Sequence, residues 1–270
     1  MAPDKMSLTD VAADQLLLID IGNTRVKCLS AAGVLSGGDA LALVHEKQFA
    51  SVLTDLIASL PKPEKILVSN VAGDLAQQAL LEACQERWSL TPCFVAVTRD
   101  TAVLHNAYQR LPELGVDRWV AAHGARQLQS GLLLVVGCGT AITVDVVSDD
   151  DVFMGGAIFP GLELAAQSLS HTAGIPLLAI HEYNDVIGQT TADCVRIGVM
   201  NACAGGVEKM VAHLCEHFDT SEINIIASGG AASTVLSGTN LKVMYDANLV
   251  LRGLLQMASS IGMPSGNKGE

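Results

Sequence analysis

Two short segments of this 270-residue chain resemble each other, and this repeat limits the possible folds more than any other feature. Each segment begins with an apolar run, passes through a Gly-containing turn with small hydroxyl residues, and ends in a second strand-like run. The segments are Leu16–Leu29 and Leu133–Val147. Because glycine lets a turn approach a ligand closely, both segments predict β-hairpins whose turns can line a binding site.

Helical and strand patterns alternate after each hairpin. Helices are predicted at Phe49–Leu60, Leu75–Trp88, Gly161–Ser170, Thr191–His217 and from Leu249, and strands at Lys65–Val71, Cys93–Val97, Val152–Ile158, Ile223–Ala227 and Leu241–Tyr245. An order that occurs twice predicts an α/β fold of two halves related by duplication. We expect a flexible extension at residues 1–15, one domain at 16–110 and a second at 111–270.

Composition narrows the possible partners. Half of the residues are hydrophobic and 16% are charged, which favours a sizeable core over disorder. A net charge of −12 argues against nucleic-acid binding, which needs a surplus of Lys and Arg. The first apolar run, Leu16–Ile19, is too short for a signal peptide or a membrane span, so we expect a cytoplasmic protein without a membrane partner.

The chain has no Walker A sequence and no GxGxxG after a strand, so phosphates would have to be held by another device. The turn Asp20–Thr24 offers one. A carboxylate at the end of a buried strand can hold Mg²⁺ through water while Gly22, Asn23 and Thr24 face phosphates, and Lys27 can neutralise their charge. The alternative is an ordinary hairpin turn whose Asp and Asn side chains stabilise the backbone.

A second candidate, Gly115–Trp119, opens a predicted helix after the polar stretch Thr98–Leu114. Asp117 could accept a proton from a substrate hydroxyl while Arg118 grips an anionic group. The alternative is an acidic residue in the first turn of a helix with a local ion pair. The Gly-rich segments Gly155–Gly161 and Ser228–Gly230 suit either close approach to a ligand or ordinary turns.

Taken in order, these motifs resemble the type III pantothenate kinase family over nearly the whole chain after residue 15. The matching segments are Asp20–Thr24, Asn106–Tyr108 (one residue shorter than the family pattern), Leu114–Trp119, Gly139–Asp145, Gly155–Gly161, Ser168–Thr172, Gly188–Thr191 with Gly198, Gly229–Gly230 and Asp246–Leu254. Each segment alone is weak evidence for the resemblance, but the occurrence of all of them in this order is specific for the family.

The resemblance implies two ribonuclease-H-like halves of the actin-like ATPase architecture with a nucleotide cleft between them. It implies a phosphotransferase that phosphorylates the primary hydroxyl of pantothenate with ATP, the first step toward coenzyme A. It also implies a homodimer that uses Mg²⁺ and a monovalent cation, K⁺ or NH₄⁺.

The resemblance also assigns roles to residues. Asp117 is the implied catalytic proton acceptor. The implied ATP-binding residues are Asp20, Ile21, Gly22, Asn23, Thr24, Arg25, Val26, Lys27 and Thr140. The implied pantothenate-binding residues are Tyr108, Gly115, Val116, Asp117, Arg118 and Thr191.

One position departs from the family pattern. The family commonly has Asp, a ligand of the monovalent cation, where this chain has Gly137. Aligning the two hairpins places Asp20 at the equivalent position, so Gly137 leaves that metal site without a side-chain oxygen. The departure is either tolerated variation or a change that removes K⁺ dependence or weakens catalysis. Two further functions stay open: a non-catalytic regulatory relative of the same fold, and another actin-like small-molecule phosphotransferase.

Overall fold

Both expected hairpins form in the computed structural model, which describes residues 11–173, 180 and 186–258. The chain divides into two compact units, Met1–Leu128 with Asn248–Glu270 (unit 1) and Gln129–Ala247 (unit 2). Among the helices in the described part of the chain, none is both long and apolar enough to cross a membrane.

Unit 1 contains a five-stranded sheet in the order β3-β2-β1-β4-β5. The strands are β1 (Leu16–Ile21), β2 (Arg25–Ser30), β3 (Leu41–Val44), β4 (Lys65–Asn70) and β5 (Cys93–Phe94). β1 pairs antiparallel with β2 and parallel with β4, β2 pairs antiparallel with β3, and β4 pairs parallel with β5. A short strand, β6 (His105–Asn106), and a 3₁₀ turn, η2 (Leu111–Glu113), follow.

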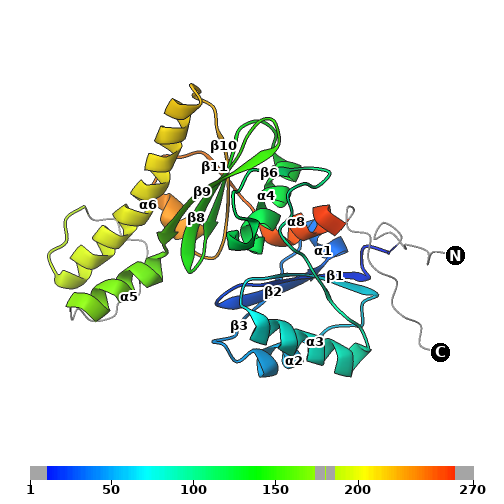
Figure 1. The fold of residues 1–270 in the computed structure, drawn as a ribbon. Helices are drawn as coiled ribbons and strands as arrows, with labels where there is room; N and C mark the ends of the chain where they lie inside the picture. The colour runs from blue at the N-terminus through cyan, green and yellow to red at the C-terminus, as the bar shows by residue number, and fades with distance from the viewer. Residues whose placement is uncertain (1–10, 174–179, 181–185, 259–270) are drawn as a thin grey trace. The chain divides into compact units, whose positions relative to one another are not determined.

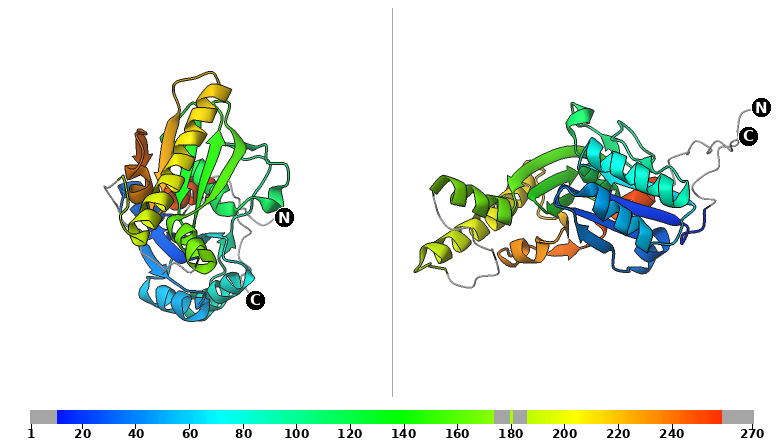
Figure 2. Two further views of the ribbon diagram at one scale, coloured as in Figure 1. Left: turned by 90° about the vertical axis from the view of Figure 1, so that its left-hand side faces the viewer. Right: turned by 90° about the horizontal axis from the view of Figure 1, so that it is seen from below.

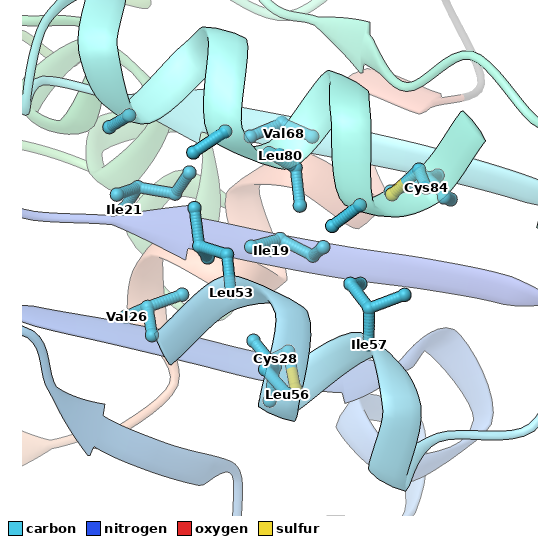
Figure 3. Packing of buried hydrophobic residues seen from close by; sticks show 14 of the residues in the cluster. Ile19, Ile21, Val26, Cys28, Leu53, Leu56, Ile57, Val68, Leu80 and Cys84 are labelled. Carbon is cyan, nitrogen blue, oxygen red and sulfur yellow. The ribbon is translucent and has the colours of Figure 1, made fainter. Parts of the chain in front are cut away.

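The helices of unit 1 are α1 (Ala31–Ser36), α2 (Phe49–Ser59), α3 (Asp74–Trp88), α4 (Val116–Leu128) and α8 (Leu249–Ala258). Helices α2 and α3 lie side by side along one face of the sheet (Figure 2). Ile19 and Ile21 of β1 pack there against Leu53 of α2 and Leu80 of α3 (Figure 3). Because side chains alternate along a strand, Leu18 and Asp20 belong to the opposite face.

Helices α4 and α8 pack against each other through two glycines. A Cβ atom on Gly253 of α8 would lie 1.8 Å from the Val120 carbonyl oxygen. A Cβ atom on Gly124 of α4 would lie 2.2 Å from the Leu249 carbonyl oxygen. The two backbones therefore approach as closely as they do only because these positions lack side chains.

Unit 2 repeats the architecture of unit 1 (Figure 1). Its strands are β7 (Leu133–Cys138), β8 (Ala141–Val147), β9 (Val152–Pro160), β10 (Asn224–Ser228) and β11 (Val243–Tyr245), and its helices are α5 (Leu162–Ala173), α6 (Thr191–His217) and α7 (Ala232–Ser237). The strands that belong to unit 2 follow the order β9-β8-β7-β10-β11, with the same parallel and antiparallel senses as β3-β2-β1-β4-β5. Apolar side chains of α5, α6 and α7 form a core on one face of this sheet.

The central strands of the two units, β1 and β7, also have the same pattern of buried residues. β1 and β7 each have four buried residues, a half-buried fifth and a buried sixth. The fifth residues are Asp20 and Gly137, as the alignment of the hairpins predicts. The expected fold class, two ribonuclease-H-like halves of the actin-like ATPase architecture, is confirmed by this duplicated topology.

The units do not coincide with the expected domain ranges 16–110 and 111–270. Residues 111–128 and 248–258 belong to unit 1, because α4 and α8 pack on each other and contact β4. Within the expected flexible extension, Ala13 accepts a backbone hydrogen bond from Ala32 and Gln15 accepts one from Glu64, while residues 1–10 lie outside the described residues. α1 and β3 are additional elements that the sequence patterns did not predict.

Candidate active site

The turn between β1 and β2 holds the first group of candidate residues. The Gly22 N–H donates to the Arg25 carbonyl oxygen over 2.9 Å, which closes the hairpin. The side chains of Asn23, Thr24 and Arg25 are exposed. Those of Ile21 and Val26 are buried in the core beneath α2 and α3, so these two can offer a ligand only their main chain.

Three polar side chains share the sheet face opposite that core. Asp20 lies directly across from Lys27 on antiparallel β2 and from Ser69 on parallel β4. Residues at one register position of neighbouring strands point to the same side of the sheet. The pairing therefore gathers a carboxylate, an ammonium group and a hydroxyl at the end of β1.

Burial dominates the electrostatics of Asp20. Burial and, after it, the negative charge of Asp117 raise the pKa of this carboxyl, the Ser69 hydroxyl and the Lys27 charge lower it, and together these effects bring the pKa from 3.8 to about 7. The Asp20 Oδ1 and Ser69 Oγ atoms are buried without a hydrogen-bond partner of good geometry among the described residues. A buried carboxylate oxygen in this state is suited to a cation or to water.

Asp117 stands in the first turn of α4. Its Oδ1 accepts the Arg118 backbone N–H over 2.9 Å. Burial raises its pKa, and the hydrogen bond and positive charge from Arg118 oppose that shift. A carboxylate at a helix N-terminus is also stabilised by the helix dipole. Because Asp117 acts on the pKa of Asp20, the two carboxylates belong to one electrostatic cluster within unit 1.

Arg118 and Tyr108 lie beside that cluster. The buried Arg118 guanidinium sits 5.9 Å from the centre of the Tyr108 ring, a distance typical of a cation–π contact. Arg99 Nη1 donates to the Tyr108 carbonyl oxygen over 3.0 Å and also to the carbonyl of Asn106. Asn106 Oδ1 accepts the Tyr108 N–H, so the segment that carries Tyr108 is fixed at several points.

Two candidate residues lie in unit 2. Thr140 is exposed in the β7–β8 turn, and its carbonyl accepts the Gly161 N–H over 3.1 Å. Thr191 is the exposed first residue of α6, directly after Thr190, whose Oγ1 accepts the Asp193 N–H. The candidate residues thus come from both units, and within unit 1 the structure brings Asp20, Lys27 and Asp117 into one cluster.

Gly137 occupies in unit 2 the place that Asp20 has in unit 1. It lies across from Thr143 on β8 and Ser228 on β10. A Cβ atom on Gly137 would lie 2.7 Å from Thr143 Oγ1. The Thr143 hydroxyl therefore stands too close for a side chain at position 137 to be added without a shift.

The residues of unit 1 fit a magnesium ion that is held mainly by its substrate. In the described ranges, no three His, Cys, Asp or Glu side chains gather as a metal-binding group. Mg²⁺ keeps several waters and commonly binds through one or two carboxylates plus phosphate oxygens. The buried Asp20 Oδ1 supplies one hard oxygen of that kind.

Sequence reasoning missed two residues of this region. Ser69 ends a run that reads as a buried strand, and only the register with β1 places it beside Asp20. His45 is buried and contacts the β1–β2 turn, yet it lies 23 residues from Gly22. Alternation along the strand predicted at Lys65–Val71 could have suggested Ser69, whereas nothing local marks His45.

Solved structures share the fold. A Campylobacter jejuni protein described as a conserved Baf family transcriptional activator matches with a TM-score of 0.57 and 22% identity, covering 88% of this chain and 94% of that one. A Sinorhizobium meliloti protein described as a 2-dehydro-3-deoxygalactonokinase matches with a TM-score of 0.52 and 16% identity, covering 90% and 98%. These likenesses concern the fold alone, which is the duplicated α/β fold of the actin-like ATPase architecture.

Sequence comparison identifies the family. The model of type III pantothenate kinases matches residues 16–213. The type III pantothenate kinase of Azoarcus sp. is 36% identical over 248 residues, which cover 91% of this chain and 91% of that protein. The enzyme of the same name from Nitrosococcus oceani is 30% identical over 253 residues, covering 90% and 93%. This chain belongs to the type III pantothenate kinase family.

Proposed function

We propose that this chain transfers the γ-phosphoryl group of ATP to the primary hydroxyl of pantothenate, with Asp117 as the proton acceptor. The observation that carries the assignment is the cluster of Asp20, Lys27 and Asp117 in unit 1. Phosphoryl transfer depends on alignment and charge neutralisation more than on covalent help from the protein. Family membership supports the substrate and the reaction.

Asp117 has the properties of a general base. Its Oδ1 is occupied by the Arg118 N–H, which fixes the carboxylate and leaves the second oxygen for the substrate hydroxyl. Burial raises its pKa, so it holds an abstracted proton more readily than an exposed Asp does. In this proposal the hydroxyl proton passes to Asp117 as the alkoxide oxygen bonds to the γ-phosphorus and the bond to the β-phosphate oxygen breaks.

The remaining residues of the proposal bind the two substrates. Asp20–Lys27 and Thr140 hold ATP, with the turn amides and Lys27 facing phosphate oxygens. Bound Mg²⁺ would neutralise charge on those oxygens, and Asp20 would hold it through water. Tyr108, the segment 115–118 and Thr191 hold pantothenate, whose carboxylate suits the Arg118 guanidinium.

A homodimer is part of the same proposal. Large hydrophobic side chains are exposed on β9 and α5 of unit 2, including Met154, Ile158, Leu164 and Leu169. Such side chains favour burial against a second copy. Light scattering should then give twice the chain mass of 28.2 kDa, and a mass equal to one chain would contradict the dimer. The expected cytoplasmic location rests on the sequence alone.

The decisive experiment measures ADP release with and without pantothenate and identifies the product by mass spectrometry. We expect pantothenate-dependent turnover and a phosphorylated product. Asp117→Asn should lower kcat by about 10²- to 10⁴-fold, the usual contribution of a general base. Asp55→Asn is the matched control, because Asp55 is exposed on α2, which covers the sheet face opposite Asp20.

Two results would contradict the proposed reaction, and a third would contradict the role of Asp117. ADP release that is independent of pantothenate would point to another phosphotransferase substrate. Absence of turnover in the folded wild-type chain would favour the non-catalytic relative. Full activity in Asp117→Asn would leave the kinase assignment intact but remove Asp117 from the role of base.

A further inference from the structure

His45 is a buried histidine that contacts the proposed phosphate turn at two points. It follows β3 directly, and only 2% of its surface is exposed. Its Nε2 atom lies 2.9 Å from the Gly22 carbonyl oxygen. Its backbone N–H donates to the Thr24 carbonyl oxygen over 3.2 Å. One residue thus holds two carbonyl groups of the turn that follows Asp20.

The partners of the imidazole fix its tautomer. The Lys47 backbone N–H donates to His45 Nδ1 over 3.1 Å, so Nδ1 is the acceptor. In a neutral imidazole the other nitrogen then carries the proton. Nε2–H therefore donates to Gly22, which can only accept. The ring accepts one hydrogen bond at Nδ1 and donates one from Nε2, and so links the loop after β3 to the turn after β1.

The loop around His45 is shaped for this contact. Glu46 and Lys47 both adopt positive φ, at 43° and 65°, a conformation that is uncommon for residues other than glycine. This backbone path turns the Lys47 N–H back toward His45. The Phe49 ring packs against the imidazole with centroids 4.5 Å apart. Unfavourable backbone conformations persist where surrounding structure enforces them, and they gather at functional sites.

Fixing the Gly22 carbonyl also fixes the next amide. In a planar trans peptide the C=O and N–H bonds point in opposite directions. Since the Gly22 oxygen is directed at His45, the Asn23 N–H is directed away from it. By the same geometry, the bond to Thr24 orients the Arg25 N–H. These amides belong to the turn that we assign to ATP.

We propose that His45 is a positioning residue that orients the Asn23 amide toward the polyphosphate of the nucleotide. The inference rests on the proposed ATP-binding role of Asp20–Lys27. It does not place His45 in contact with ATP. A preorganised amide stabilises an anion without the cost of ordering the turn on binding.

Three substitutions separate this role from simple filling of space. His45→Gln extends far enough for its amide N–H₂ to donate to Gly22. His45→Asn carries the same amide group on a side chain that is one bond shorter. It can therefore accept the Lys47 N–H but does not reach the Gly22 carbonyl oxygen. His45→Phe retains the ring volume against Phe49 and removes both side-chain hydrogen bonds. The Kd of a fluorescent ATP analogue, the KM for ATP and the KM for pantothenate are measured for each, with thermal melting as the test of folding.

We expect His45→Asn and His45→Phe to raise the Kd and the KM for ATP by about tenfold, the effect of one lost hydrogen bond. The KM for pantothenate should stay near the wild-type value, and His45→Gln should recover most of the loss. Equal nucleotide affinity in the Gln and Asn variants would overturn the inference. So would parallel increases in both KM values that follow the loss of thermal stability.

Nucleotide binding keeps this test independent of catalysis. If the wild-type chain binds the ATP analogue without pantothenate-dependent turnover, the proposed function fails, and the Kd series alone decides the role of His45. If the folded wild-type chain does not bind the analogue, the assignment of the turn to ATP fails and the inference about His45 fails with it.

Discussion

Gly115 and Asp117 are packed so closely that a Cβ atom at position 115 would lie 2.6 Å from Asp117 Oδ1. That oxygen is the one that accepts the Arg118 N–H. Gly115 has no positive φ, so the reason for glycine here is space and not backbone conformation. The proposed base therefore depends on a missing side chain two residues earlier.

Gly115→Ala should displace the Asp117 carboxylate and lower kcat. A misplacement of about 1 Å at a reacting group can cost about 10²-fold, so we expect a loss of about 10- to 100-fold. Steady-state kinetics with both substrates measures it. Gly205→Ala in α6 is the control, because a Cβ atom there has no neighbour within 4 Å. Unchanged kcat in Gly115→Ala would show that the carboxylate tolerates the added methyl group.

Stability should fall as the pH rises through the range where Asp20 titrates. The pKa of Asp20 is about 7 in the folded chain against an ordinary value of 3.8. Between these values the folded state keeps a proton that the unfolded state has released, so stability is full below about pH 4 and is lost as the pH approaches 7. The slope is at most about 1.4 kcal/mol per pH unit.

Urea unfolding of metal-free protein from pH 4 to pH 8 measures this slope, with Asp20→Asn as the comparison. Burial also raises the pKa of Asp117, so this residue lowers the stability with rising pH in both proteins. The wild-type chain should therefore lose more stability over this range than Asp20→Asn. Parallel curves would contradict the raised pKa of Asp20.

Gly253→Ala should destabilise unit 1. The new Cβ atom would stand 1.8 Å from the Val120 carbonyl oxygen, and backbone cannot move aside as a flexible side chain does. Overpacking of this kind costs about 1–3 kcal/mol or more. Gly205→Ala should instead gain about 0.5–1 kcal/mol, because alanine is favoured over glycine in an open helix. Equal urea midpoints for the two variants would contradict the close packing of α4 on α8.

Turnover should be equal in Na⁺ and K⁺ buffers. Gly137 has no side-chain oxygen for a cation, and Thr143 Oγ1 stands 2.7 Å from where its Cβ atom would be. Kinetics in matched chloride salts provides the test, and clear stimulation by K⁺ would show that other oxygens complete the cation site. Gly137→Asp should lower the thermal stability, and Thr143→Ala should restore part of that loss by opening space.

The repeated hairpins and their alternating helices were predictable because their signals are local. The period-2 and helical patterns predicted α6 at Thr191–His217 and placed β1, β4 and β7 correctly. The alignment of Asp20 with Gly137 was also visible in the sequence, and matching burial along β1 and β7 confirms it. α1 and β3 escaped prediction because six-residue and four-residue elements carry little periodicity.

The sequence by itself determined the duplicated α/β fold, the family and the candidate residues, because motifs and hydrophobic periodicity lie within short stretches of chain. Only the tertiary structure decided which candidate residues lie close together. Strand register placed Ser69 and Lys27 beside Asp20, and packing of α8 on α4 assigned residues 111–128 to the first unit. A buried histidine reached the turn at Gly22 across 23 residues. Such contacts depend on pairing between segments distant in sequence, which no local pattern specifies.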